Sequence, residues 1–160
     1  RIEHAELLHP EHIERMARYG IVASCQPNFI GQWSLQGGLY EKRLGFERNA
    51  RNNPYGEILG KGVTLAFGSD GMPYGPLDGI HWAVNAPFGI QRLRVDQAFA
   101  AYTVGGATAG FQEHEHGMLA PGRLGDAVVL ERDPWREPER IRDCAVSMTV
   151  VAGRVAWRAA

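Results

Sequence analysis

The chain has 160 residues, 44% of them hydrophobic, with 17 basic and 18 acidic side chains and a formal net charge of −1. This length suits one compact domain with a real core, and the balanced charge excludes long-range attraction to nucleic acid or anionic membrane surfaces. No apolar run approaches the roughly 18 residues that span a bilayer, and the first residues lack the features of a signal peptide. We therefore expect a cytoplasmic protein.

The N-terminal part has the alternation of helix and strand that is typical of α/β proteins. Arg1-Ile2-Glu3-His4 has the pattern of a strand end, so we expect the strand to begin upstream and the chain to be a piece of a longer protein. Apolar residues at helical spacing then follow Pro10 and stop at Gly20, which predicts a short helix. Ile21-Val22-Ala23-Ser24-Cys25 is a compact apolar run, and it predicts a buried strand that ends at Gln26-Pro27.

A second unit repeats this order after a long polar segment. Residues 28 to 56 are rich in glycine and asparagine, and they predict a long loop with room for one helical turn. Residues 57 to 62 have the pattern of a helix end with a glycine cap. The apolar run that follows, residues 63 to 70, predicts a buried strand that ends at Asp70.

The remainder of the chain changes character near residue 117. Residues 71 to 89 predict another loop, interrupted by a turn of helix at residues 81 to 84. Residues 94 to 109 have helical spacing and should cover the preceding strand. Beyond them we expect a short strand at residues 126 to 131 and a hairpin within residues 146 to 157.

Two side chains at predicted strand ends could carry chemistry, namely His4 and Asp70. The carboxyl ends of parallel strands meet at one face of a sheet, where active sites of α/β folds lie. An imidazole and a carboxylate suit zinc or a similar divalent ion, and a carboxylate beside the metal can take a proton from its bound water. The residues also allow another interpretation, in which His4 is a satisfied core histidine and Asp70 caps the next segment.

Three further residues are candidates for contact with a substrate: Gln26 at the end of the other strand, Trp33 on the first long loop and His81 on the second. The alternatives are a strand-end hydrogen bond for Gln26, loop packing for Trp33 and a plain surface role for His81. His114-Glu115-His116 has metal-ligand spacing, but its polar surroundings favour a solvated linker.

An ordered series of segments resembles the C-terminal part of the amidohydrolase superfamily, in the YtcJ-like branch that includes N-substituted formamide deformylase. The series covers nearly the whole chain, which makes it more specific than any single motif. The segments are Arg1-Ile2-Glu3-His4-Ala5-Glu6, residues 21 to 27, Gly68-Ser69-Asp70, residues 98 to 103 and residues 117 to 130.

The resemblance implies an α/β fold, the C-terminal portion of a (β/α)₈ TIM-type barrel (about strands six to eight) with part of a flanking β-sandwich. Residues 1–112 would be the partial barrel and residues 113–160 the sandwich segment. His4 would match the metal-binding histidine of strand six, and Asp70 the strand-eight aspartate that binds metal and accepts the proton of the attacking water. The family's ligands from strands one, four and five have no counterpart in this sequence.

The function implied is hydrolysis of non-peptide carbon–nitrogen bonds, in amides or formamides, by metal-activated water, with zinc the first choice of metal. The expected partners are a small-molecule amide substrate and either the missing N-terminal part or further copies of the chain. Two alternatives stay open: an inactive truncated remnant that folds and oligomerises, and a small-molecule binding module.

Overall fold

The computed structural model describes residues 1–72 and 74–160, and these residues form two three-stranded sheets. Pro73, within the loop predicted for residues 71 to 89, lies outside the described residues. The first sheet is parallel with the order β1-β2-β3, and the second is antiparallel with the order β4-β5-β6. The strands are β1 (Ile2–Glu3), β2 (Ala23–Cys25), β3 (Leu65–Phe67), β4 (Ala127–Leu130), β5 (Val146–Val151) and β6 (Arg154–Arg158).

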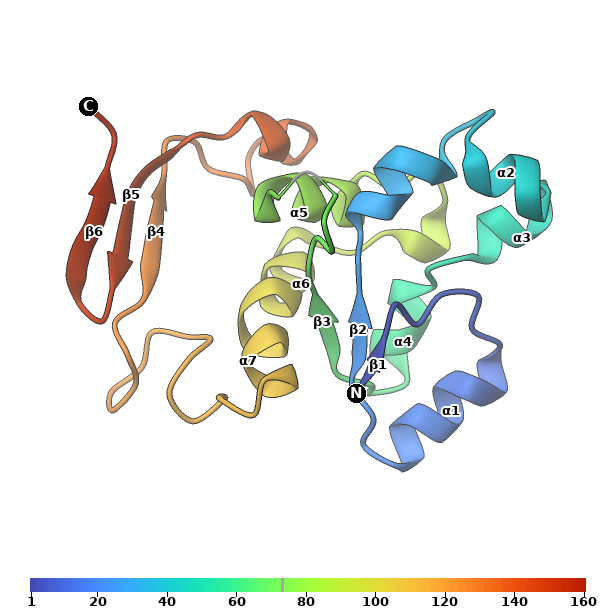
Figure 1. Cartoon of the computed structure of the whole chain (residues 1–160), viewed down its shortest axis with the longest axis horizontal. Helices are drawn as coiled ribbons and strands as arrows, with labels where there is room; N and C mark the ends of the chain where they lie inside the picture. Colours follow the sequence, from blue (N-terminus) through green and yellow to red (C-terminus); the bar gives the residue numbers. More distant parts are fainter. Residues whose placement is uncertain (73) are drawn as a thin grey trace.

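Helices fill most of the chain between these strands (Figure 1). The α-helices are α1 (Pro10–Arg18), α2 (Leu39–Leu44), α3 (Phe46–Arg51), α4 (Tyr55–Gly60), α5 (Pro76–Val84), α6 (Val95–Ala100) and α7 (Gly106–Ala109). The other helical turns are the π-helical η1 (Ile30–Ser34) and η3 (Ala101–Gly105) and the 3₁₀-helical η2 (Gly89–Gln91) and η4 (Pro138–Asp143). No helix of the described residues is long and apolar enough to cross a membrane.

The parallel sheet forms where the sequence predicted buried strands. Backbone N–H groups of Ile2 and Ala23 donate to the carbonyls of Val22 and Thr64, each across 2.9 Å. All three strands point the same way (Figure 1), with helix α1 between β1 and β2 and helices α2 to α4 between β2 and β3. The predicted strands at residues 21 to 25 and 63 to 70, and the predicted helix after Pro10, are therefore confirmed.

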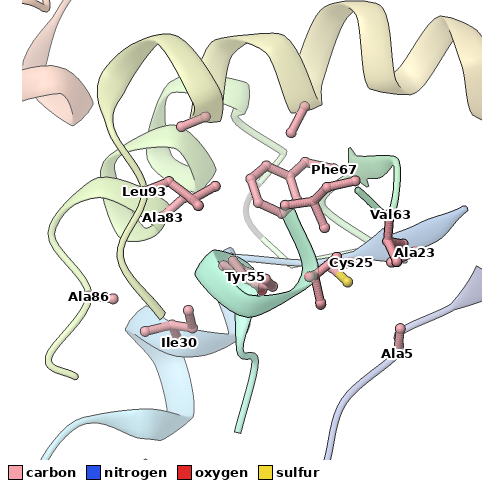
Figure 2. Packing of buried hydrophobic residues seen from close by; sticks show 14 of the residues in the cluster. Ala5, Ala23, Cys25, Ile30, Tyr55, Val63, Phe67, Ala83, Ala86 and Leu93 are labelled. Carbon is pink, nitrogen blue, oxygen red and sulfur yellow. The ribbon is translucent and has the colours of Figure 1, made fainter. Parts of the chain in front are cut away.

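The core lies between the parallel sheet and its helices. Tyr55 of α4 is fully buried, and its ring packs edge-on against Phe67 with the centroids 5.0 Å apart. Figure 2 shows these rings beside Cys25 and Leu93, from the next strand and from the segment before α6. Burial raises the pKa of the Tyr55 hydroxyl and of the Cys25 thiol well above their ordinary values. Both groups are therefore neutral packing elements.

A continuous helical run, α6-η3-α7, packs on strand β3, as the sequence predicted for residues 94 to 109. Its closest approach is at Gly105, where an added Cβ would overlap the carbonyl oxygen of Leu65. The next residue, Gly106, has open space at the same position. At the end of the run the Arg1 guanidinium donates to the Ala109 carbonyl across 2.7 Å. The helix therefore lies directly against the strand backbone.

The prediction of a long loop at residues 28 to 56 was wrong, because η1, α2, α3 and the start of α4 occupy it. The helices α2 and α3 have six residues each, too few for hydrophobic periodicity to show. Hydrogen bonds between buried polar groups hold this segment: Ser34 Oγ donates to Asn49 Oδ1 across 2.7 Å, and Asn49 Nδ2 donates back to the Ser34 carbonyl across 2.9 Å. Polar contacts therefore hold η1 to α3, while Ile30 and Tyr55 of the same segment are buried in the core.

The second predicted loop also contains more helix than expected. Helix α5 runs over nine residues from Pro76 instead of one turn at residues 81 to 84. A proline at the first helical position is favourable because its missing N–H has no helical partner there. On the inner face of α5, the side chains of Ile80 and Ala83 are buried.

The C-terminal sheet confirms the predicted strand and hairpin at residues 126 to 131 and 146 to 157. Figure 1 shows it beyond α5, α6 and α7, on the side away from α1. It joins the rest of the chain through η4, which packs against α5.

The two adjacent glycines of the long helical run give a test of its contact with β3. Replacement of Gly105 with alanine should lower the free energy of unfolding by about 1–3 kcal/mol, because the new methyl group must displace the strand backbone. The matched change Gly106→Ala should be neutral or raise it by up to about 1 kcal/mol, since alanine favours helix. Urea unfolding measures both. Equal effects of the two changes would contradict the close approach at Gly105.

Candidate functional site

Side chains from all three parallel strands meet at the carboxyl edge of the sheet. His4 follows β1 directly, Gln26 follows β2 directly, and Asp70 lies three residues beyond β3. His4 and Asp70 have positive φ angles of 67° and 45°. Such angles are uncommon outside glycine, and in folded proteins they gather at functional sites. The backbone thus turns sharply at two of the three strand ends.

The geometry joins these three side chains into one cluster. His4 Nδ1 lies 3.0 Å from Gln26 Oε1, so the imidazole donates its Nδ1 proton to the amide oxygen. The Nε2 lone pair of His4 is then free for another partner. Asp70 Oδ2 is 3.9 Å from the same Nδ1, with 56% of the His4 and 58% of the Asp70 side chain exposed. The imidazole and the carboxylate both face solvent, and that distance exceeds a direct hydrogen bond.

An aromatic series extends from this cluster. The ring of Phe29 stacks on His4 with the centroids 6.2 Å apart, and Trp33 packs on Phe29 at 4.5 Å. Tyr40 in turn meets Trp33 edge-on at 5.6 Å. The predicted substrate contact Trp33 is therefore linked to His4 through Phe29, a residue that no sequence pattern singled out.

A half-buried acid near His4, Glu6, was also missed. Tyr40 donates a 2.6 Å hydrogen bond to Glu6 Oε1. Burial raises the pKa of the Glu6 carboxyl, while this hydrogen bond and the nearby charge of His4 oppose the rise. The acid ties the loop after β1 to helix α2. Its place two residues after His4 was a signal that sequence reasoning could have used.

A chain of polar contacts supports the neighbouring strand ends. Tyr102 donates to Asn28 Oδ1 across 3.2 Å, and Asn28 Nδ2 donates to Asp78 across 3.3 Å. Asp78 also accepts from Arg142 at 2.9 Å. Burial raises the pKa of Tyr102, and a hydrogen bond from Ser69, the residue before Asp70, partly opposes the rise. The chain of contacts therefore runs from the Asp70 strand end to η4.

The structure places His81 apart from this cluster. It is buried in α5, and its Nδ1 is 3.3 Å from the amide nitrogen of Asn85, which also donates to the Pro138 carbonyl. Burial, and after it the charge of Arg142, lowers the pKa of His81. His81 thus belongs to the contact between α5 and η4.

The paired histidines at residues 114 and 116 take no part in the cluster. His114 is exposed, and His116 lies 3.0 Å from Asp126 Oδ2 at the start of β4. His116 therefore anchors the linker to the second sheet.

The donors at the strand ends fit part of a metal site. An imidazole nitrogen and a carboxylate oxygen are both donors that zinc accepts, and a catalytic zinc usually has about three protein ligands. Within residues 1–72 and 74–160, however, no three or more His, Cys, Asp or Glu side chains are grouped to hold a metal ion. His4 and Asp70 therefore present an incomplete ligand set.

Comparison with known proteins identifies relatives of this chain. "Protein LONG AFTER FAR-RED 3" of Arabidopsis thaliana is 32% identical over 165 residues, which cover 96% of this chain and 28% of that protein. "Putative amidohydrolase YtcJ" of Bacillus subtilis is 31% identical over 173 residues, covering 98% of this chain and 32% of that protein. The chain thus spans about a third of the length of these relatives.

A solved structure is also similar to this chain. An uncharacterised metal-dependent hydrolase from Pyrococcus furiosus superposes with a TM-score of 0.73 at 28% sequence identity, over 84% of this chain and 28% of that one. The model of the amidohydrolase family matches residues 1–157. This chain belongs to the amidohydrolase family.

Proposed function

We propose that the chain supplies the C-terminal share of a metal-dependent hydrolytic site that cleaves non-peptide carbon–nitrogen bonds, such as those of amides or formamides. The observation that carries the proposal is the meeting of His4, Gln26 and Asp70 at the carboxyl ends of three adjacent parallel strands. Family membership supports hydrolysis, and the Pyrococcus furiosus neighbour supports dependence on a metal.

The finer architecture belongs to the same proposal. Strands β1, β2 and β3 would be strands six, seven and eight of a (β/α)₈ barrel formed with other residues, and residues 1–112 would be the barrel share. Residues 113–160 would be one share of a flanking β-sandwich. The parallel order and the intervening helices support this assignment.

The metal would be held by His4 and Asp70, with zinc the first choice from the nitrogen and oxygen donors present. When bound, it would supply Lewis-acid polarisation of the substrate carbonyl and make water a better nucleophile at neutral pH. Gln26 orients the His4 ring through the 3.0 Å contact with Nδ1, which fixes the tautomer.

The other steps fall to side chains of this chain. The exposed carboxylate of Asp70 would accept the proton of the attacking water. The amide NH₂ of Gln26 has no protein partner among the described residues, so it could donate to a substrate oxygen. Trp33 and Phe29 would provide an apolar wall beside His4. In this proposal His81 stabilises the α5-η4 contact instead of touching substrate.

The incomplete ligand set implies a partner. Among the described residues, β1 pairs only with β2, so its other edge is open to a further strand. We propose that residues outside this chain, from the N-terminal part of a longer protein or from a second copy, complete the site. The competing hypothesis is that the chain is a folded but inactive remnant. The absence of a third metal ligand among the described residues favours this hypothesis.

Metal titration tests the two proposed ligands. Calorimetric titration with Zn²⁺ should show that His4→Gln and Asp70→Asn each weaken binding by at least about tenfold, because each removes a donor. His114→Gln is the matched control, since His114 is an exposed histidine outside the cluster, and its affinity should equal that of the unchanged chain. If all three variants bind zinc equally, the proposed ligands are wrong, and a folded chain that binds no zinc favours the inactive remnant.

Replacement of Gln26 with leucine should weaken Zn²⁺ binding by about 10–100-fold even though no metal donor is lost. The change keeps the side chain's size and removes the acceptor that orients the His4 ring. Unchanged affinity in the same titration, with an unchanged melting temperature, would remove Gln26 from the site.

The isolated chain should show no zinc-dependent hydrolysis of formamides or other amides above buffer, because it offers two of the roughly three protein ligands required. Chromatographic detection of the released amine is a sensitive measurement. Metal-dependent turnover by a pure sample of these residues would overturn the requirement for a partner.

A further inference from the structure

A hollow of about 600 Å³ is lined by residues of the loop after β1 and of helix α3. Figure 1 shows this loop and this helix on the side of the molecule away from the second sheet. The hollow is lined by Leu7, Leu8, His9, Arg48 and Arg51. Its volume is within the range of sites that bind small molecules, roughly 300–1,000 Å³. None of these residues belongs to the cluster of His4, Gln26 and Asp70.

The two arginines of the hollow lack counter-charges. Arg48 and Arg51 lie three residues apart on α3, so they share one face of the helix. Neither makes an ion pair or a side-chain hydrogen bond with any other residue of the described ranges. Several other arginines of this chain are paired, such as Arg142 with Asp78 at 2.9 Å. Two neighbouring positive charges without a partner favour an anion between them.

The rest of the lining is formed by His9 and by the two apolar side chains of Leu7 and Leu8. Leu7 is 47% exposed, and Leu8 is partly buried against the core. Leu7 has a positive φ of 51°, and its N–H donates to the buried Asn52 Oδ1 across 2.9 Å. Because Asn52 directly follows α3, this hydrogen bond holds the leucines and the arginines on opposite sides of one preformed hollow.

We propose that this hollow binds a small organic acid, with the carboxylate held by Arg48 and Arg51 and the hydrocarbon part in contact with Leu7 and Leu8. Guanidinium groups bind carboxylates through paired N–H donors, and the exposed side chain of Leu7 is stabilised by removal from water. The ligand therefore carries one anionic group and an apolar body. This inference concerns binding alone and does not depend on the proposed hydrolysis.

Calorimetric titration of the whole chain with hexanoate, and separately with inorganic phosphate, tests the proposal. Hexanoate should bind saturably at one site and more tightly than phosphate, because phosphate cannot contact the leucines. Arg48→Gln with Arg51→Gln should weaken hexanoate binding by about tenfold or more, since both donors are lost. The matched control is Arg43→Gln, which removes the same charge from an exposed arginine outside the hollow and should leave the affinity unchanged.

A second variant separates the apolar contact from the charge. Leu7→Asn keeps a residue that tolerates the positive φ, and it should weaken hexanoate binding while phosphate binding stays the same. Melting temperatures report that each variant is folded. The proposal is overturned if hexanoate does not saturate, if phosphate binds as tightly as hexanoate, or if Arg43→Gln reduces affinity as much as the change at Arg48 and Arg51.

Discussion

Parallel pairing of β1, β2 and β3 in a single register decides where the side chains of the site lie. Glu3 pairs with Ser24, and Cys25 pairs with Phe67, so the residues that follow β1 and β2 leave the sheet at the same edge. A slip of one residue would move His4 by about 3.3 Å along the strand. The 3.0 Å contact between His4 and Gln26 would not survive that shift. The cluster therefore depends on backbone pairing before it depends on any side-chain contact.

The sequence predicted the elements that are held by apolar burial. Strands β2 and β3 and helix α1 were found because each has a compact apolar run or an apolar face. The helices between residues 28 and 56 were not found, because they are short and because buried asparagines and a serine hold η1 to α3. From the sequence alone, asparagines such as Asn49 and Asn52 are typical of a loop. The geometry that makes them interior residues arises only when the chain is folded.

The same contrast applies to the site. His4 and Asp70 were selected because they follow apolar strands, and the structure brings Asp70 and Gln26 to the same imidazole, that of His4. Sequence patterns did not select Phe29, Glu6 or Tyr40. These residues come near His4 only through the turns at positive φ that follow β1 and through the helices after β2. His81 was selected because of its loop position, but α5 turns it towards η4. Local pattern locates strand ends, whereas side-chain direction needs the tertiary fold.

The order of the strands in the parallel sheet has a consequence for how the cluster forms. Neighbouring strands in the sheet are also consecutive in the sequence, so each pairing closes one local loop instead of joining distant ends of the chain. A chain that folds from its N-terminus as it is synthesised can pair β1 with β2 and form the His4–Gln26 contact before β3 has been made. Asp70 joins last. In a chain that folds in this order, the orientation of the histidine is set before the carboxylate arrives.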